Sequence, residues 1–71
     1  MSKRQLTFVV FIMYKLSDAW NMSVPQVYER LRKVGVLDEY IISFYDVLHT
    51  LGQEYLVEDI TAMVNEREAK L

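Results

Sequence analysis

The sequence predicts an all-α protein, a compact bundle of about four helices that forms a single domain over residues 1–71. Three observations support this fold class. Apolar residues recur every three or four positions along most of the chain, which is the spacing of one face of an α-helix. The strong helix breakers are few, namely Pro25, Gly35 and Gly52. No stretch alternates apolar and polar residues for long, as a half-buried strand would.

The first helix is expected over residues 3–20, and it is unusually apolar. At about 100° per residue, its apolar side chains cover about 200° of its circumference, and Phe11 and Tyr14 fall outside even that arc. A helix of this kind lies at the centre of a fold or has two partners. We therefore expect it to be the central helix. The alternative is that Phe11 and Tyr14 belong to an interface with another molecule.

Three further helices are expected over residues 24–34, 37–51 and 54–69. Ser23 and Gln26 have the spacing of a capping box, and Pro25 occupies the first turn, where its missing N–H does no harm. Gly35 and Gly52 are expected to end the second and third helices. The apolar stripe of the third helix is predicted to consist of Leu37, Tyr40, Ile41, Phe44, Val47, Leu48 and Leu51.

Length and composition favour association with another protein. A chain of 71 residues buries only about 60% of the surface it exposes when unfolded, so its core is marginal without help. The absence of cysteine excludes disulfides and thiolate metal sites. The apolar fraction of 52% slightly exceeds the usual share of about 45–50%. We therefore expect a protein partner or self-association.

Charge is distributed unevenly along the chain. Residues 1–33 carry a net +4, residues 34–66 a net −7 without any base, and residues 67–71 a net +1, which together give −2. Such asymmetry indicates charged partners or head-to-tail contact within or between molecules. The alternative is a solvated surface whose halves neutralise each other. The acidic surface is expected to include Asp38, Glu39, Glu54, Glu58 and Asp59.

The same distribution argues against nucleic acid as a ligand. The second and third helices, joined at Gly35, could form a helix-turn-helix, whose second helix needs Arg, Lys, Asn or Gln facing the major groove. The exposed positions here are Asp38, Glu39, Ser43, Asp46 and Thr50. Phosphates would repel the acids, so a small DNA-binding regulator is disfavoured.

A cytoplasmic location without membrane association is expected. No apolar run reaches the length of about 20 residues that a membrane span needs. The N-terminal region is basic and then apolar, as in a signal peptide, but Lys15 interrupts the path to the cleavage site and Asp18 lies within it.

Polar side chains cluster on the third helix at Tyr45, Asp46, His49 and Thr50. The spacings of three and four residues allow these side chains to meet. They could form hydrogen bonds of purely structural value, for example a buried one that locks the third helix to the fourth. Alternatively, Ile42, Tyr45 and His49 form a second stripe suited to docking a partner helix.

Catalysis and metal binding fit this cluster less well. Asp46 and His49 supply at most two metal ligands, with Glu58 or Asp59 as a possible third. Carboxylate sites in helical bundles use paired Glu-x-x-His motifs, and this chain has one histidine. Neither a nucleophile elbow nor a phosphate-binding loop is present. We therefore expect no enzymatic activity, no cofactor and no metal.

The stretch from Phe44 to Gly52, FYDVLHTLG, resembles the signature of a family of short bacterial proteins, domain of unknown function three-seven-nine-one. The starts of the second and fourth helices and the turn around Gly35 are similar too. The resemblance implies that Tyr45, Asp46, His49 and Thr50 matter to the family, whose genes often lie beside those of ADP-ribosyltransferase-like proteins. It suggests an antitoxin-like or accessory interaction module. The alternative is a structural homo-oligomer.

Overall fold

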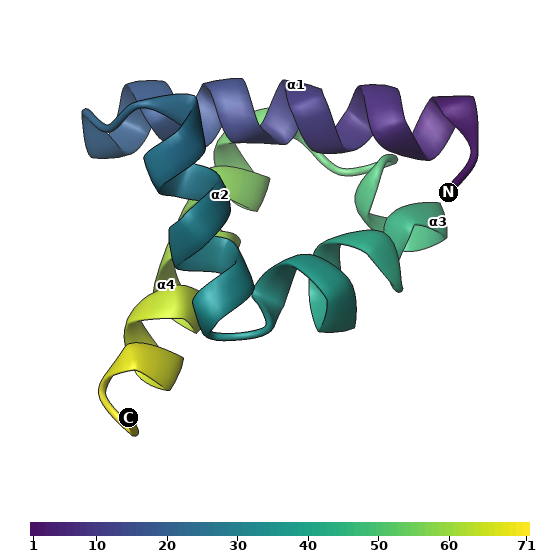
Figure 1. Cartoon of the computed structure of the whole chain (residues 1–71). Helices are drawn as coiled ribbons and strands as arrows, with labels where there is room; N and C mark the ends of the chain where they lie inside the picture. The colour runs from purple at the N-terminus through teal and green to yellow at the C-terminus, as the bar shows by residue number, and fades with distance from the viewer.

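The computed structural model describes all 71 residues, and they form helices joined by turns. In chain order the elements are α1 (Lys3–Trp20), α2 (Val24–Lys33), a π-helix η1 (Leu37–Ile42), α3 (Tyr45–Leu48) and α4 (Gln53–Glu68). Figure 1 shows them in sequence from the purple N-terminus to the yellow C-terminus. The all-α prediction is confirmed.

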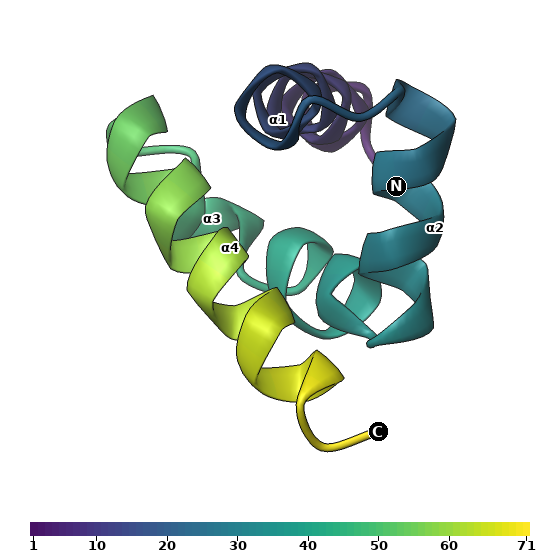
Figure 2. The same ribbon diagram turned by 90° about the vertical axis from the view of Figure 1, so that its left-hand side faces the viewer.

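Helix α1 packs against α2, α4 and η1, as the prediction of a central helix requires. It is not enclosed, however. Figure 2 looks along α1 and shows α2 on one side and α4 on the other, with η1 and α3 beneath. The opposite side of α1 has no covering element, and Phe11 and Tyr14 are both exposed.

The turn signals predicted around Ser23 and Gly35 are confirmed, but the one at Gly52 is not: α3 already ends at Leu48, and Gly52 is the N-cap residue of α4. Ser23 and Gln26 form the capping box at the start of α2, and Ser2 and Gln5 form a second one at the start of α1. Asn21 ends α1 in the left-handed conformation with φ 52°, which asparagine tolerates better than most residues. Gly35 follows α2 with φ 77°, a conformation that is free of strain only for glycine.

A single cluster of buried apolar side chains forms the core, and no polar or charged residue is buried with them. Every element contributes to it. The members are Val9, Ile12, Leu16, Val27, Leu31, Val34, Val36, Leu37, Ile41, Leu48, Leu56, Ile60 and Val64.

The prediction of one continuous helix over residues 37–51 was wrong. The π-helix ends at Ile42, a turn follows at Ser43 and Phe44, and α3 makes a single turn. Ser43 Oγ donates to the carbonyl of Asp38, five residues earlier, at 2.7 Å. A π-turn is wider than an α-turn, so it rotates the following residues away from the expected face.

The apolar stripe predicted for this segment is therefore only partly correct. Leu37, Ile41 and Leu48 are buried, whereas the side chains of Phe44 and Val47 are 51% and 58% exposed. Leu51 lies beyond α3 in the turn before Gly52 and is also exposed. No helix of the protein combines the length and the apolar character needed to cross a membrane.

Candidate functional site

A groove of about 720 Å³ runs between the N-terminal half of α1 and the segment formed by α3 and its following turn. It lies on the side of α1 that faces α3, at the edge of the core. Its lining consists of Lys3, Arg4, Thr7, Phe8, Phe11, Tyr45, His49, Leu51 and Leu56.

Helical periodicity explains why these residues meet. On α1 they recur at intervals of three and four residues from Lys3 to Phe11, so they share one side of the helix. On the opposite wall, Tyr45 and His49 are four residues apart and stand one above the other. Leu56 is a buried residue of α4 and forms part of the floor.

Aromatic contacts fix the shape of the groove. The ring of Phe8 meets that of Tyr45 edge to face, with centroids 5.4 Å apart and planes at 71°. The ring of His49 stacks on Tyr45 at 4.6 Å and 14°. Edge-to-face and stacked pairs of this kind are the favourable geometries. The two walls of the groove are thus joined by the Phe8–Tyr45 contact.

His49 makes its hydrogen bond within its own turn. Its Nδ1 lies 2.8 Å from the carbonyl oxygen of Tyr45, and because a carbonyl only accepts, Nδ1 carries the hydrogen. Nε2 is then the nitrogen free to accept a bond from a ligand or partner. The predicted cluster therefore does not lock the third helical segment to α4. That link is made by Tyr40, whose hydroxyl donates to the carboxylate of Asp59.

The structure brings together three of the predicted site residues and separates the others. Phe11, Tyr45 and His49 line the groove, but Asp46 and Thr50 are exposed outside it. Thr50 Oγ1 donates to the carbonyl of Val47 at 2.7 Å.

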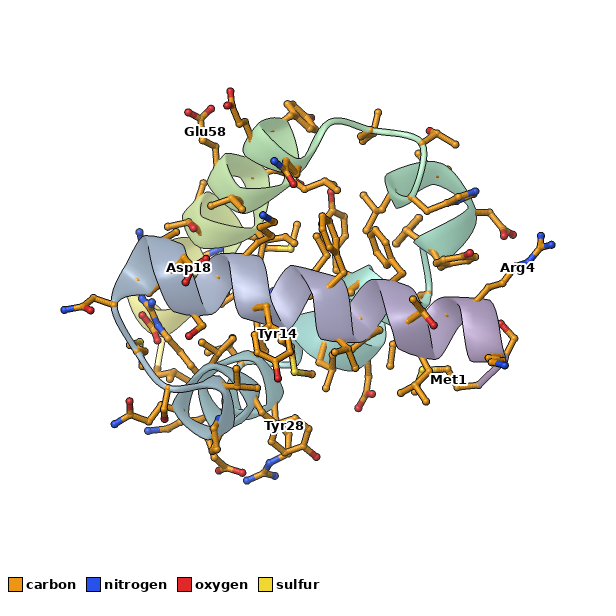
Figure 3. The ribbon with its side chains drawn as sticks, turned by 90° about the horizontal axis from the view of Figure 1, so that it is seen from above. Met1, Arg4, Tyr14, Asp18, Tyr28 and Glu58 are labelled. Atoms are coloured by element: carbon orange, nitrogen blue, oxygen red, sulfur yellow. The ribbon has the colours of Figure 1, made fainter.

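Two further predicted site residues lie elsewhere. Ile42 is half-buried against the core, so the proposed Ile42–Tyr45–His49 stripe is not one continuous surface. Tyr14 is exposed on another side of α1, and Figure 3 shows it on the same side as Tyr28.

Sequence reasoning missed six of the nine residues that line the groove. Phe8, Leu51 and Leu56 were assigned to apolar core faces, Lys3 and Arg4 were counted only as part of the basic half, and Thr7 was not considered. The spacing of Arg4, Phe8 and Phe11, at i, i+4 and i+7, could have indicated a shared face. Nothing in the sequence indicates that Leu51 leaves the helix and turns toward them.

The charged groups that line the groove are all basic. Neither Lys3 nor Arg4 forms an ion pair, and no carboxylate lines the groove. Elsewhere the C-terminal residues 67–71 pair with both other parts of the chain, but no ion pair joins residues 1–33 directly to residues 34–66. Arg30 pairs with Glu68, and this hydrogen-bonded pair holds the pKa of Glu68 below its usual value. Arg67 pairs with Glu39 and also donates to the carbonyl of Val34 at 2.9 Å.

The predicted acidic surface accordingly divides into two groups. Glu39 and Asp59 are held by Arg67 and Tyr40. Asp38, Glu54 and Glu58 are exposed and form no ion pair. No three His, Cys, Asp or Glu side chains gather closely enough to hold a metal ion.

The family model described as "Protein of unknown function (DUF3791)" matches residues 7–67 of the chain. This range contains Phe8, Phe11, Tyr45, His49 and Leu51 of the groove, and the match bears out the resemblance of the chain to this family. No curated protein and no solved structure matches the chain.

Proposed function

The chain belongs to the DUF3791 family, and from this premise we propose that it is a protein–protein interaction module whose docking surface is the groove beside α1. One observation carries the proposal. Phe11 and Leu51, exposed by 41% and 39%, stand in a groove that also presents Phe8, Tyr45 and His49. Aromatic side chains grouped in a concave surface are the usual anchors of protein interfaces.

The chemistry of the lining defines the kind of partner. The apolar walls suit an apolar side chain or one face of a helix, in the helix-in-groove mode. Lys3 and Arg4 lie unpaired at one end of the groove. We therefore propose a partner segment that combines apolar anchors with carboxylates, because carboxylates would satisfy these two cations.

The family resemblance suggests which partner to test first. An ADP-ribosyltransferase-like protein encoded by a neighbouring gene would make this chain an antitoxin-like or accessory subunit, acting in the bacterial cytoplasm. We propose this as the first pairing to examine. The groove and its unpaired cations support a binding role, while the choice of this enzyme rests on the family resemblance.

The experiment is capture of the partner by the tagged chain, followed by calorimetric titration of the purified pair. Phe11→Ser should abolish or strongly weaken binding without lowering the melting temperature, because the Phe11 side chain is largely outside the core. Phe44→Ser is the matched control, since it removes an equally large, exposed aromatic ring outside the groove.

The two variants separate the possible outcomes. Loss of binding in Phe11→Ser alone supports the groove as the docking surface. Equal binding by wild type and both variants would refute it. If Phe11→Ser melts early, Leu51→Ser repeats the test from the opposite wall of the groove, on a turn that contributes nothing to the buried core.

A further inference from the structure

We infer that the partner this groove fits is a second copy of the chain, docked about a two-fold axis through the face that carries the groove. This inference rests on the proposed function and names the partner. The groove face is defined by Lys3 and Arg4 at one end, Phe11 and Leu51 in the middle, and Glu54 and Glu58 at the other end.

The first step is that these residues share one face. A second hollow, of about 290 Å³, is lined by Lys15, Gln53, Glu54, Val57 and Glu58. It adjoins the groove, because Lys15 lines the hollow and its Nζ lies 5.5 Å from the centroid of Phe11, which lines the groove. Both therefore lie along the side of α1 that faces α3 and the start of α4. Figure 3 looks down on α1 and shows Arg4 near one end and Glu58 toward the other.

The second step is the distribution of charge along this face. The end with Lys3 and Arg4 has no acid in the groove lining, and neither Glu54 nor Glu58 forms an ion pair. Lys15 lines the hollow beside Glu54 and Glu58 but forms no ion pair with them, so this end keeps an excess of negative charge. The excess charges of opposite sign lie at opposite ends, so one copy does not pair them. Other charged side chains, such as Arg30 and Arg67, are neutralised within the chain.

The third step is symmetry. A two-fold axis through the middle of a face brings each end over the opposite end of the other copy. Lys3 and Arg4 of one copy then face Glu54 and Glu58 of the other, and this occurs twice. Phe11 and Leu51 lie near the axis and meet their own counterparts. The result has an apolar centre with complementary charges around it, which is the usual layout of a specific interface.

The test reverses the charges at one end of the face or the other and measures dimerisation by sedimentation equilibrium. The wild-type chain should show a concentration-dependent dimer. In one variant Lys3→Glu and Arg4→Glu make both ends acidic, and in a second Glu54→Lys and Glu58→Lys make both ends basic. Each alone should raise the dimer dissociation constant at least about tenfold, because like charges now face each other. An equimolar mixture of the two variants should restore the dimer, with one copy of each.

The experiment also checks that the substitutions do not act by disturbing the fold. Acids in the first turn of α1 favour its N-terminus, so Lys3→Glu with Arg4→Glu cannot act by weakening that helix. Circular dichroism checks the second variant, whose new bases lie in the first two turns of α4. Lys33→Glu, an exposed charge reversal at the end of α2, should leave the dimer unchanged.

The failures of the two proposals are distinguishable. A wild-type monomer at every concentration overturns the self-docking inference, as does a dimer that ignores all four charge reversals. Neither result touches partner capture by the groove, which Phe11→Ser tests separately. If Phe11→Ser changes neither dimerisation nor partner capture, the proposed function itself fails.

Discussion

The guanidinium of Arg30 binds both carboxylate oxygens of Glu68, with Nε and Nη2 each donating at 2.8 Å. Nη2 also donates to Asn65 Oδ1 at 2.9 Å, and the guanidinium lies 4.3 Å from the centroid of the Trp20 ring. The Trp20 indole N–H in turn donates to Thr61 Oγ1 at 2.8 Å. One side chain of α2 thereby joins the end of α1 to the last turns of α4.

Arg30→Ala should lower the free energy of unfolding by about 1–2 kcal/mol, because it removes a bidentate pair and a cation–π contact that are only partly exposed. In a domain of this size, each kcal/mol corresponds to a fall of about 4–8 °C in melting temperature. Urea denaturation followed by the fluorescence of the only tryptophan measures the change.

Arg32→Ala is the control, because Arg32 pairs with Glu29 at 3.0 Å on the open surface of the same helix. Exposed pairs of this kind contribute little. Equal losses of stability in the two variants would show that the contacts of Arg30 with Glu68, Asn65 and Trp20 stabilise the fold no more than an exposed ion pair does.

Alanine substitution should lower the stability far more at Gly35 than at Gly52. Gly35→Ala should cost about 1–2 kcal/mol, because Gly35 has a φ of 77°, which a Cβ makes unfavourable. The added Cβ would also lie 2.8 Å from Glu39 Oε2 and 3.3 Å from Arg67 Nη1, so the Glu39–Arg67 pair would have to shift. Thermal unfolding followed by circular dichroism measures the effect.

Gly52→Ala is the matched substitution at an unstrained position. Its φ is −67°, and a Cβ there meets nothing within 4 Å. We expect a much smaller loss of stability than in Gly35→Ala, because the restriction of the unfolded chain by alanine partly offsets the preference for glycine over alanine at the N-cap of α4. A Gly52→Ala variant as unstable as Gly35→Ala would contradict this account of both turns.

Val47 and Leu48, adjacent residues of α3, test whether residues 37–51 form one continuous helix, as the sequence predicts, or the interrupted one that is observed. Leu48→Ala should cost about 2–5 kcal/mol, since Leu48 is almost completely buried. Val47→Ala should have little effect, because the Val47 side chain is 58% exposed. Both residues belong to the core stripe predicted from an uninterrupted helix, so comparable losses, measured by urea denaturation, would support that prediction instead.

The fold could be predicted from the sequence wherever local chemistry determines it. Ser23, Gln26 and Pro25 define the start of α2, and Gly35 defines the turn after it, with helix boundaries within one residue of those observed. The break in the third helix could not be predicted. The spacing of Ile41, Phe44 and Leu48 is compatible with a continuous helix, and only packing against α1 and α2 distinguishes a π-turn there.

The part of the candidate site that depends on local sequence could likewise be predicted. Phe11 stands out because it lies outside the apolar arc of its own helix, which is a local property. Its assembly with Leu51 depends on where the chain turns after α3, and that is a tertiary property. The basic and acidic halves were visible in the sequence, but not which charges stay unpaired.

The hydrogen bond of Tyr40 should make the stability of the protein fall at alkaline pH. Its hydroxyl donates to the Asp59 carboxylate, and burial together with this bond raises the pKa of Tyr40 to about 12 from a usual value of 10.0. Because the folded pKa exceeds the unfolded one, the stability linked to the neutral phenol is fully present below about pH 10. It is lost as the pH rises through about 12.

Tyr40→Phe tests this linkage directly. At neutral pH the variant should be less stable by about 1 kcal/mol, because the hydrogen bond to Asp59 is lost. Between pH 10 and about 12 the wild type should lose its advantage, so the two unfolding free energies converge. All other titrating groups are common to both proteins and cancel in the difference. Urea denaturation at successive pH values measures the gap, and phenolate absorbance should show a component near pH 12 that only the wild type contains. A gap that stays constant across this range would mean that the phenol of Tyr40 titrates alike in the folded and unfolded chains.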